Sequence, residues 1–199
     1  MKLKIRYARE EDLPQIKRLI DTCISRDFYS LEDLEGMLCR EDDLLYVTVD
    51  MEKEEKVVSY FYAFLAPLDE ALHVLHVTEK PKELQKYPGS ERVGVYKTSS
   101  TDPAYRNQGV FSSFMEDLQP VLRSKGAKLI INTALRPLGR DIPILNILRS
   151  TGFVPLQTLH SPWANTKGYC PYCKKDHCIC DAVLFMREFD LKGDEENHG

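Results

Sequence analysis

The sequence contains no apolar run close to the ~20 residues that a helix needs to cross a bilayer. Residues 1–6 alternate charged and apolar side chains, so they lack the apolar segment of a secretory signal peptide. Excess positive charge is also missing, because 27 Lys and Arg residues stand against 31 Asp and Glu residues and the net charge is −4. This balance disfavours a general electrostatic attraction to nucleic acid. We expect a cytoplasmic protein with no membrane partner and with nucleic acid disfavoured as a partner.

Internal repeats and low-complexity linkers are absent from the sequence as well. The 199 residues, of which 43% are hydrophobic, suffice to bury one substantial core. We therefore expect a single domain over residues 1–192. The small and acidic residues 193–199 are expected to form a flexible tail.

The spacing of apolar residues alternates between strand and helix patterns, which predicts a mixed α/β (α+β) fold. Expected strands are 3–8, 44–49, 57–65, 93–101, 128–133, 154–159 and 182–189, and expected helices are 13–20, 31–38, 111–122 and 142–150. Ser30 followed by Asp33 predicts a capping box at the second helix. Residues 71–77 suggest an extra strand. On a strand, His73 and His76 would point to opposite faces, which favours surface or packing roles over a metal pair.

The segment Arg106–Phe111 lies where an extended run gives way to a helical one. A helix N-terminus offers unpaired backbone N–H groups, and together with the helix dipole they suit a pyrophosphate. Gly109 would let the backbone approach a phosphate, and Arg106 could add a charge-assisted contact. Taken alone, this segment is equally compatible with an ordinary strand–helix turn.

Residues 101–111, Thr-Asp-Pro-Ala-Tyr-Arg-Asn-Gln-Gly-Val-Phe, resemble a motif of the GNAT superfamily of acetyl-CoA-dependent N-acetyltransferases. That motif reads Arg/Gln-x-x-Gly-x-Gly/Ala after a run ending Val-x-Pro-x-Tyr. Residues 5–14 resemble the family's first strand and helix start, and residues 141–153 its final helix and Gly-Phe strand. The resemblance covers about residues 3–160 and 181–189. It implies a twisted, mixed, mainly antiparallel sheet flanked by helices.

The resemblance also implies the substrates and the residues that bind the cofactor. Acetyl-CoA would be the cosubstrate, an amine would attack its thioester directly, and a homodimer is one possible assembly. Backbone groups of the strand end would pair with the pantetheine arm, and the loop and helix start would hold the pyrophosphate. The expected cofactor-binding residues are Ser99, Ser100, Thr101, Arg106, Asn107, Gln108, Gly109, Val110, Phe111 and Ser112.

Three departures from the family pattern leave the catalytic residues unknown. Phe111 stands where the family prefers Gly or Ala, and Leu148 where many members carry a Tyr that protonates the thiolate. The strand 93–101 contains no Glu to act as a general base. Because a thiol has a pKa of roughly 8.5, water or a nearby Tyr could protonate the leaving group.

Four of the six cysteines fall within eleven residues, with the spacing C-x2-C-x4-C-x-C. Four converging thiolates suit a structural Zn²⁺, and the expected ligands are Cys170, Cys173, Cys178 and Cys180. An iron–sulfur cluster, a local disulfide and free thiols remain as alternatives, and His177 could replace one cysteine. The cluster lies in a long loop, residues 160–181, between the last two expected strands. In the resembled fold this connection lies near the acceptor site.

The remaining residues of note allow more than one role. Cys23 and Cys39 are expected to be small core residues of helices. Trp163 and Tyr169 could pack against the cysteine loop or line the mouth of the acceptor channel. The expected function is N-acetyl transfer from acetyl-CoA to an amine, with a structural zinc near the acceptor site. The alternatives are a catalytically weak acetyl-CoA-binding or zinc-dependent interaction protein, and a nucleic-acid-binding protein that uses Lys174 and Lys175.

Overall fold

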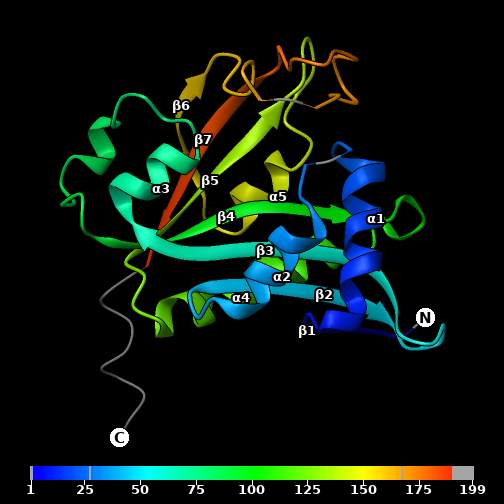
Figure 1. Ribbon diagram of the computed structural model, residues 1–199. Coiled ribbons are helices and arrows are strands. Elements are labelled where there is room, and N and C mark those ends of the chain that lie inside the picture. Colours follow the sequence, from blue (N-terminus) through cyan, green and yellow to red (C-terminus); the bar gives the residue numbers. More distant parts are fainter. Residues whose placement is uncertain (1, 27, 167, 190–199) are drawn as a thin grey trace, which may run out of the picture.

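The computed structural model describes residues 2–26, 28–166 and 168–189 (Figure 1). Seven strands form one sheet in the order β1-β2-β3-β4-β5-β7-β6. The strands are β1 (Leu3–Tyr7), β2 (Asp43–Asp50), β3 (Lys56–Pro67), β4 (Arg92–Thr101), β5 (Leu129–Arg136), β6 (Val154–Leu159) and β7 (Asp181–Glu188). Only β4 and β5 pair in parallel, and every other pair is antiparallel. The expected mixed, mainly antiparallel sheet is confirmed. The tail 193–199 lies outside the described residues.

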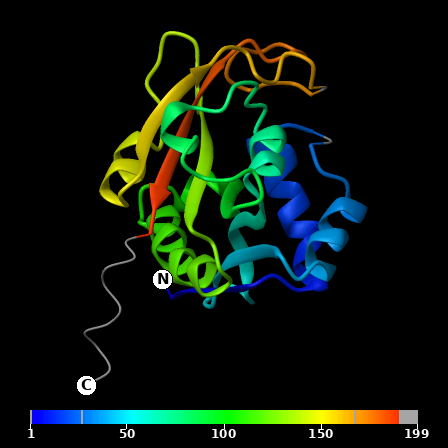
Figure 2. The ribbon, with the colours of Figure 1, turned by 90° about the vertical axis from the view of Figure 1, so that its left-hand side faces the viewer.

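Helices cover both faces of this sheet (Figure 2). They are α1 (Leu13–Cys23), α2 (Leu31–Cys39), α3 (Leu68–Val74), α4 (Val110–Ser124) and α5 (Leu145–Ser150), with 3₁₀ turns at Glu10–Asp12, Lys82–Leu84 and Pro103–Tyr105. α1, α2 and α3 pack on one face, where Ile16 and Ile20 are fully buried. α4 and α5 pack on the other, where Phe114, Leu118 and Leu148 are fully buried. Each such side chain contributes about 1.5–3 kcal/mol by leaving water.

The expected extra strand at residues 71–77 is wrong. Residues 68–74 form α3, followed by a turn at His76, whose φ of 59° is left-handed. Leu68, Ala71, Leu72 and Leu75 are buried at spacings of three, four and seven residues, the pattern of one helix face. Tertiary burial of that stripe outweighs the strand propensity of the residues around Val74.

Other local expectations have mixed outcomes. The capping box is confirmed, because Ser30 Oγ accepts from Asp33 N at 3.0 Å and Asp33 Oδ2 accepts from Ser30 N at 2.7 Å. Cys39 is exposed, so its expected core role is wrong; it lies in the last turn of α2, on the solvent side. Cys23 is half-buried.

The strands β4 and β5 separate soon after they begin. They pair only from Gly94–Ile130 to Tyr96–Asn132. In Figure 1 β5 starts beside β4 and then rises away from it with β7 and β6. A register shift between Tyr62 and Ala63 of β3 makes Lys97 an extra residue in β4 at this point, and such a bulge bends a strand. The sheet therefore opens between β4 and β5.

Candidate functional site

The loop before α4 is held to the β2–β3 turn by buried polar contacts. Tyr105 is buried, and its hydroxyl donates to Asp50 Oδ2 at 2.7 Å and accepts from Lys53 Nζ at 3.0 Å. Asp102 accepts from Ala104 N at 3.0 Å and from Lys56 Nζ at 3.1 Å. The start of the loop is therefore fixed by ion pairs and by the Tyr105 ring.

The next residues turn the chain into α4 with an exposed backbone. Residues 106–109 are exposed, Asn107 has φ 60°, and Gly109 is the N-cap of α4 with φ 78°. A Cβ built on Gly109 would meet no heavy atom within 4 Å, so it would project into open space. Arg106 Nε donates to Thr101 O at 3.1 Å, which holds the guanidinium beside the end of β4. This geometry suits an anion at the N-terminus of a fifteen-residue helix.

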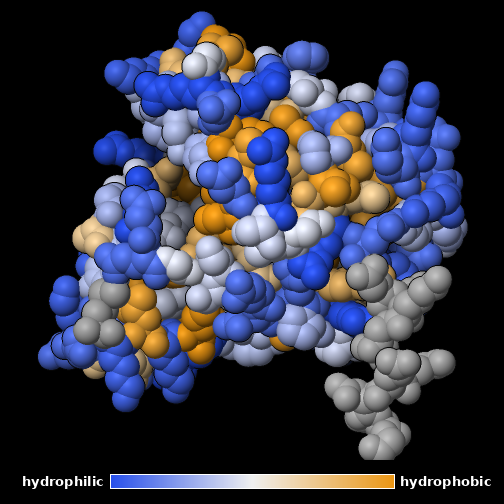
Figure 3. Space-filling view, turned by 180° about the vertical axis from the view of Figure 1, so that it is seen from behind, coloured by the Kyte–Doolittle hydropathy of each residue, from blue (hydrophilic) through white to orange (hydrophobic). Residues whose placement is uncertain are grey.

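A cavity of about 320 Å³ passes through the opening between β4 and β5. Its walls come from both faces of the sheet, including Phe111 and Met115 of α4 and Cys23 at the end of α1. Figure 3, which views the face that carries α4 and α5, shows apolar side chains gathered in its upper half within a frame of hydrophilic ones. The full lining is Cys23, Ile24, Ser25, Phe28, Phe61, Tyr96, Lys97, Thr98, Ser99, Phe111, Met115, Asn132, Thr133, Ala134, Leu135, Pro143, Ile144, Leu148, Trp163, Thr166, Gly168, Tyr169, Cys170, Pro171, Tyr172 and Cys178.

The structure brings some of the expected cofactor-binding residues to this cavity. Ser99 and Phe111 line it, and the Phe111 ring lies 5.7 Å from that of Phe61. Ser100 and Thr101 instead bond to β3, where Ser59 Oγ donates to Ser100 O at 2.8 Å. The other expected residues form the loop and first turn of α4 and do not line the cavity: Arg106, Asn107, Gln108, Gly109, Val110 and Ser112.

Tyr96 is a cavity residue that the sequence interpretation missed. Leu148, at the position where many GNAT members carry a Tyr, is fully buried and lines the same cavity. The Tyr96 hydroxyl donates to Met115 O at 3.3 Å, and burial raises its pKa well above the usual value. Its phenol is therefore protonated at neutral pH. The apolar alternation of β4 was the available signal, because it puts Tyr96 on the α4 face with Gly94.

The sequence interpretation also missed Lys97. A lysine directly after four buried strand residues indicates a charge that lies close to the interior. Lys97 is the only Asp, Glu, Lys, Arg or His among the cavity-lining residues in the described part of the chain. Its Nζ donates to Val74 O at 2.9 Å, at the C-terminal end of α3. Burial lowers the pKa of the Lys97 amine to about 8.

The four clustered cysteines converge as their spacing predicts. The four sulfur atoms of Cys170, Cys173, Cys178 and Cys180 all lie within 4.8 Å of one another. Cys170 N donates to Lys175 O at 2.9 Å, and Lys174 N donates to Cys170 O at 2.8 Å, which closes a tight turn around the first two. In a tetrahedral Zn²⁺ site with bonds of about 2.3 Å, sulfurs are about 3.8 Å apart, so only a small contraction is needed.

The environment of the thiols suits a cation. Burial opposes ionisation of Cys173, yet hydrogen bonds from the backbone of Ile179 and Lys175 outweigh it and lower its pKa to about 7. Burial raises the pKa of Cys178 and of Cys180. A metal ion would reverse those two shifts, because it stabilises thiolates directly.

His177 stands apart from this cluster. Its Nδ1 donates to Ala164 O at 3.1 Å, and the His177 ring is not among the groups that converge with the sulfurs in the described residues. It therefore braces the loop rather than replacing a cysteine.

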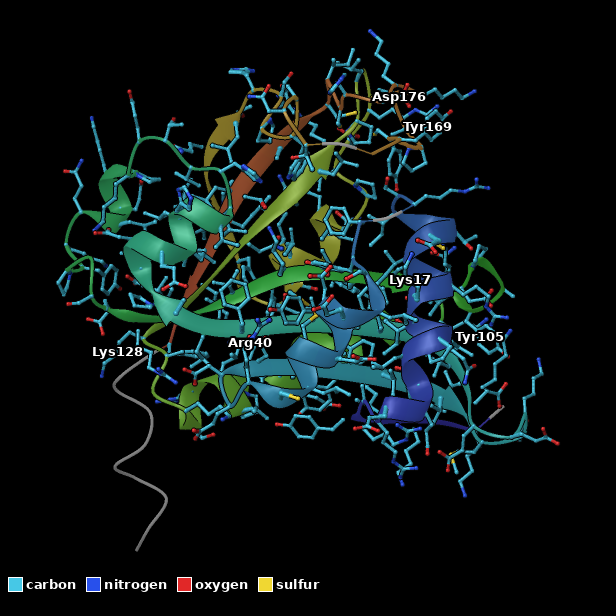
Figure 4. The ribbon with its side chains drawn as sticks, in the orientation of Figure 1. Lys17, Arg40, Tyr105, Lys128, Tyr169 and Asp176 are labelled. Carbon is cyan, nitrogen blue, oxygen red and sulfur yellow. The ribbon has the colours of Figure 1, made fainter. Side chains whose placement is uncertain are left out.

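The cysteine loop roofs the cavity. Cys170 and Cys178 belong to the sulfur cluster and also line the cavity, and Trp163 packs against the cluster from the cavity side. Tyr169 lines the cavity and is 50% exposed, above the end of α1 (Figure 4). A Cβ built on Gly168 would lie 2.6 Å from Ser25 Oγ, so the roof touches the segment that follows α1. Trp163 thus packs against the cysteine loop and also lines the cavity, the two roles that the sequence left open.

Comparison with known proteins gives the fold and no closer relative. No family model and no curated protein matches the sequence. Solved N-acetyltransferases do match over nearly the whole chain. The NatC complex bound to Gag peptide and CoA is 15% identical with a TM-score of 0.68. The match spans 95% of this chain and 99% of the other. Arabidopsis thaliana NAA60 in complex with acetyl-CoA is 13% identical with a TM-score of 0.69. The match spans 94% of this chain and 99% of the other.

A bacterial structure matches equally broadly. The ribosomal-protein-S18-alanine N-acetyltransferase from Escherichia coli is 14% identical with a TM-score of 0.63, and 98% of each chain is covered. The chain thus has the GNAT fold, with a four-cysteine cluster between β6 and β7. No described helix is long and apolar enough to cross a membrane.

Proposed function

We propose that this GNAT-fold chain is an N-acetyltransferase that moves the acetyl group of acetyl-CoA to an amine. The observation that carries the proposal is the cavity between β4 and β5, which is reached from both faces of the sheet and lies next to the exposed N-terminus of α4. Such a passage can hold the thioester and the amine in line from opposite sides. Two substrates placed this way gain rate chiefly from positioning.

The cofactor half lies on the α4 side. The backbone N–H groups of Gly109 to Ser112 would hold the pyrophosphate, and Arg106 would add a charged contact. The pantetheine arm would enter the opening, where β4 beyond Tyr96 has β3 as a partner on one side and no longer pairs with β5 on the other. Its free backbone groups would bond to the amides of the arm, and one N–H would stabilise the oxyanion.

The chemistry would proceed by direct attack. The nitrogen lone pair attacks the thioester carbon, the C–S bond breaks, the nitrogen loses a proton and the sulfur gains one. We propose that the Tyr96 hydroxyl donates a hydrogen bond to the departing sulfur, because it lines the cavity and Leu148 supplies no phenol there. Burial raises the pKa of this phenol well above that of a thiol, so the phenol stays protonated and stabilises the thiolate, while the proton lost by nitrogen reaches sulfur through water.

The cysteine cluster fits one structural Zn²⁺. The site has four thiols, their sulfurs lie within 4.8 Å, and Cys173 ionises easily. Four protein ligands leave no open position, so the ion would order the roof of the acceptor side rather than act on the substrate.

Two observations favour a second candidate, an acetyl-CoA-binding protein with little turnover. Leu148 occupies the usual acid position, and Phe111 stands in the phosphate motif. Thiol release from acetyl-CoA in the presence of pooled amines decides between the two. Acetyl-CoA binding with amine-dependent thiol release supports the enzyme, and binding without release on any amine supports the second candidate.

A further inference from the structure

Lys97 places a positive charge inside the cavity for which the proposed chemistry has no use. Its amine donates one hydrogen bond, to Val74 O at 2.9 Å. Among the described residues no carboxylate lies within 4.0 Å of Nζ, so the charge has no ion-pair partner there. An ammonium carries three donors, and the two others remain for a ligand. An unpaired charge in a largely apolar cavity is costly, which makes an anionic ligand group favourable here.

The rest of the described lining is aromatic or aliphatic with scattered hydroxyls. Seven aromatic rings line the cavity: Phe28, Phe61, Tyr96, Phe111, Trp163, Tyr169 and Tyr172. No Asp or Glu of the described residues lines it. A polyamine or another polycation would have to lose its water shell beside Lys97 without a counter-charge from the described lining. The lining therefore disfavours polycationic acceptors and favours an apolar body with one negative group.

The acceptor side is bounded by a contact between two segments. The cysteine loop and the segment after α1 meet at Gly168 and Ser25, where a single added Cβ would come within 2.6 Å of the serine oxygen. The cavity of about 320 Å³ has to hold the acetyl end of the cosubstrate as well. This closure favours a small molecule over an extended polypeptide.

We propose that the acceptor is a free α-amino acid with an aromatic or large apolar side chain, whose carboxylate pairs with the Lys97 ammonium. The α-amine would then face the thioester in the opening between β4 and β5, and the side chain would lie among the rings under the cysteine loop. This inference rests on the proposed function, because it names the acceptor of that reaction.

The test compares two ligands of nearly equal size, one with a carboxylate and one with a neutral amide in its place. L-Phenylalanine and L-phenylalaninamide would be titrated into the zinc-loaded full chain saturated with CoA. The fluorescence of Trp163, the single tryptophan, reports on the cavity wall directly, and calorimetry gives the same constants independently. Wild-type protein should bind L-phenylalanine about tenfold more tightly or better, as expected for a charge-assisted contact.

Three variants separate the roles of Lys97. Lys97→Met should lose the preference for the carboxylate, and it should fold because it removes an unpaired buried charge. Lys97→Arg should keep the preference, since Arg retains the charge yet cannot act as a general base. Lys128→Met, an exposed lysine far from the cysteine loop (Figure 4), should behave as wild type.

Each other outcome overturns the inference. Equal binding of both ligands, no binding of either, or a preference that survives in Lys97→Met removes the carboxylate contact. Tighter binding of the amide would indicate a peptide N-terminus as the acceptor. The proposed function fails differently: the carboxylate preference would be present, yet no acetyl group would appear on the bound amino acid.

Discussion

The side-chain amide of Asn132 donates to the backbone oxygen of Tyr96 at 2.9 Å, across the last pair of residues that joins β4 to β5. Both residues are buried, and both line the cavity. The bond adds a side-chain donor to the Tyr96 carbonyl at the end of the parallel ladder. It thus marks the end of the β4–β5 pairing, where the opening between the two strands begins.

Replacing Asn132 with Ala should remove this buried hydrogen bond at the edge of the cavity. We expect a loss of roughly 0.5–1.5 kcal/mol in the free energy of unfolding, the usual net contribution of one hydrogen bond. Acetyl transfer should fall by more than stability alone explains, because the thioester position moves. Urea unfolding and steady-state rates check this. The exposed Asn146 on α5 is the control, and Asn146→Ala should change neither quantity.

Gly109→Val should weaken acetyl-CoA binding strongly. A valine there places two methyl groups in the open space that the pyrophosphate would occupy, and it strains a backbone at φ 78°. Calorimetric titration of acetyl-CoA measures the effect. Unchanged affinity would refute the pyrophosphate assignment.

Gly139→Val controls for the strain. Gly139 has φ 66° and equally open surroundings, but it lies in the turn after β5 and outside the cavity lining. Both variants should lose about 1–2 kcal/mol of folding stability from a side chain in the left-handed region. Only Gly109→Val should lose acetyl-CoA affinity.

Tyr96→Phe should lower kcat by about tenfold or more while leaving acetyl-CoA affinity unchanged, because only the hydrogen bond to the departing sulfur is lost. The hydroxyl makes a long bond of 3.3 Å to Met115 O, so folding should change little. Tyr60 on β3 is also buried and lies outside the cavity lining. Tyr60→Phe should therefore keep full turnover, and equal losses in both variants would contradict the assignment of Tyr96.

Removal of the proposed zinc should disorder the roof and spare the sheet. Residues 160–180 contribute few large apolar side chains to the two main core clusters, so we expect their order to depend on the bonds from the cysteines to the metal. Cys173→Ser should lose zinc, raise hydrogen exchange in this loop, and impair amine turnover more than acetyl-CoA binding. Elemental analysis that finds neither zinc nor iron in protein purified without chelator would refute the site.

Binding of L-phenylalanine should weaken as pH rises from 7 to 9.5. Burial lowers the Lys97 pKa to about 8, so the ammonium that would pair with the carboxylate is present below that value and lost above it. His76, which follows α3, lies near this charge, and burial lowers the pKa of its imidazole, so it stays neutral over this range. L-Phenylalaninamide should lack this trend except where its own amine titrates.

The sequence predicted α4 correctly because one segment carries all the signals. Phe114, Leu118 and Leu122 repeat at helix spacing directly after Gly109, so pattern and turn chemistry agree. The same spacing was present at Leu68, Ala71, Leu72 and Leu75, but the short length of α3 and its Val and His residues masked it. Periodicity over seven residues separates helix from strand poorly.

The cavity could not be predicted in the same way. The cysteine spacing was sufficient for the cluster because the four cysteines lie close in sequence. Lys97 reaches the cavity through a bulge in β4, and its partner carbonyl comes from α3, 23 residues away. Whether a residue such as Lys97 lines the cavity depends on where β4 and β5 separate, and the sequence pattern does not show where two strands separate.

Transfer of an isotope-labelled acetyl group tests the central claim most directly. Acetyl-CoA carrying ¹³C in its acetyl carbonyl would be incubated with the zinc-loaded protein and an amine panel that includes L-phenylalanine, and the products followed by NMR and mass spectrometry. We predict that the label moves to an amine nitrogen in step with free CoA, and that Gly109→Val abolishes the transfer. A label that stays on CoA with every amine, in protein shown to bind acetyl-CoA, would contradict the assignment as an acetyltransferase.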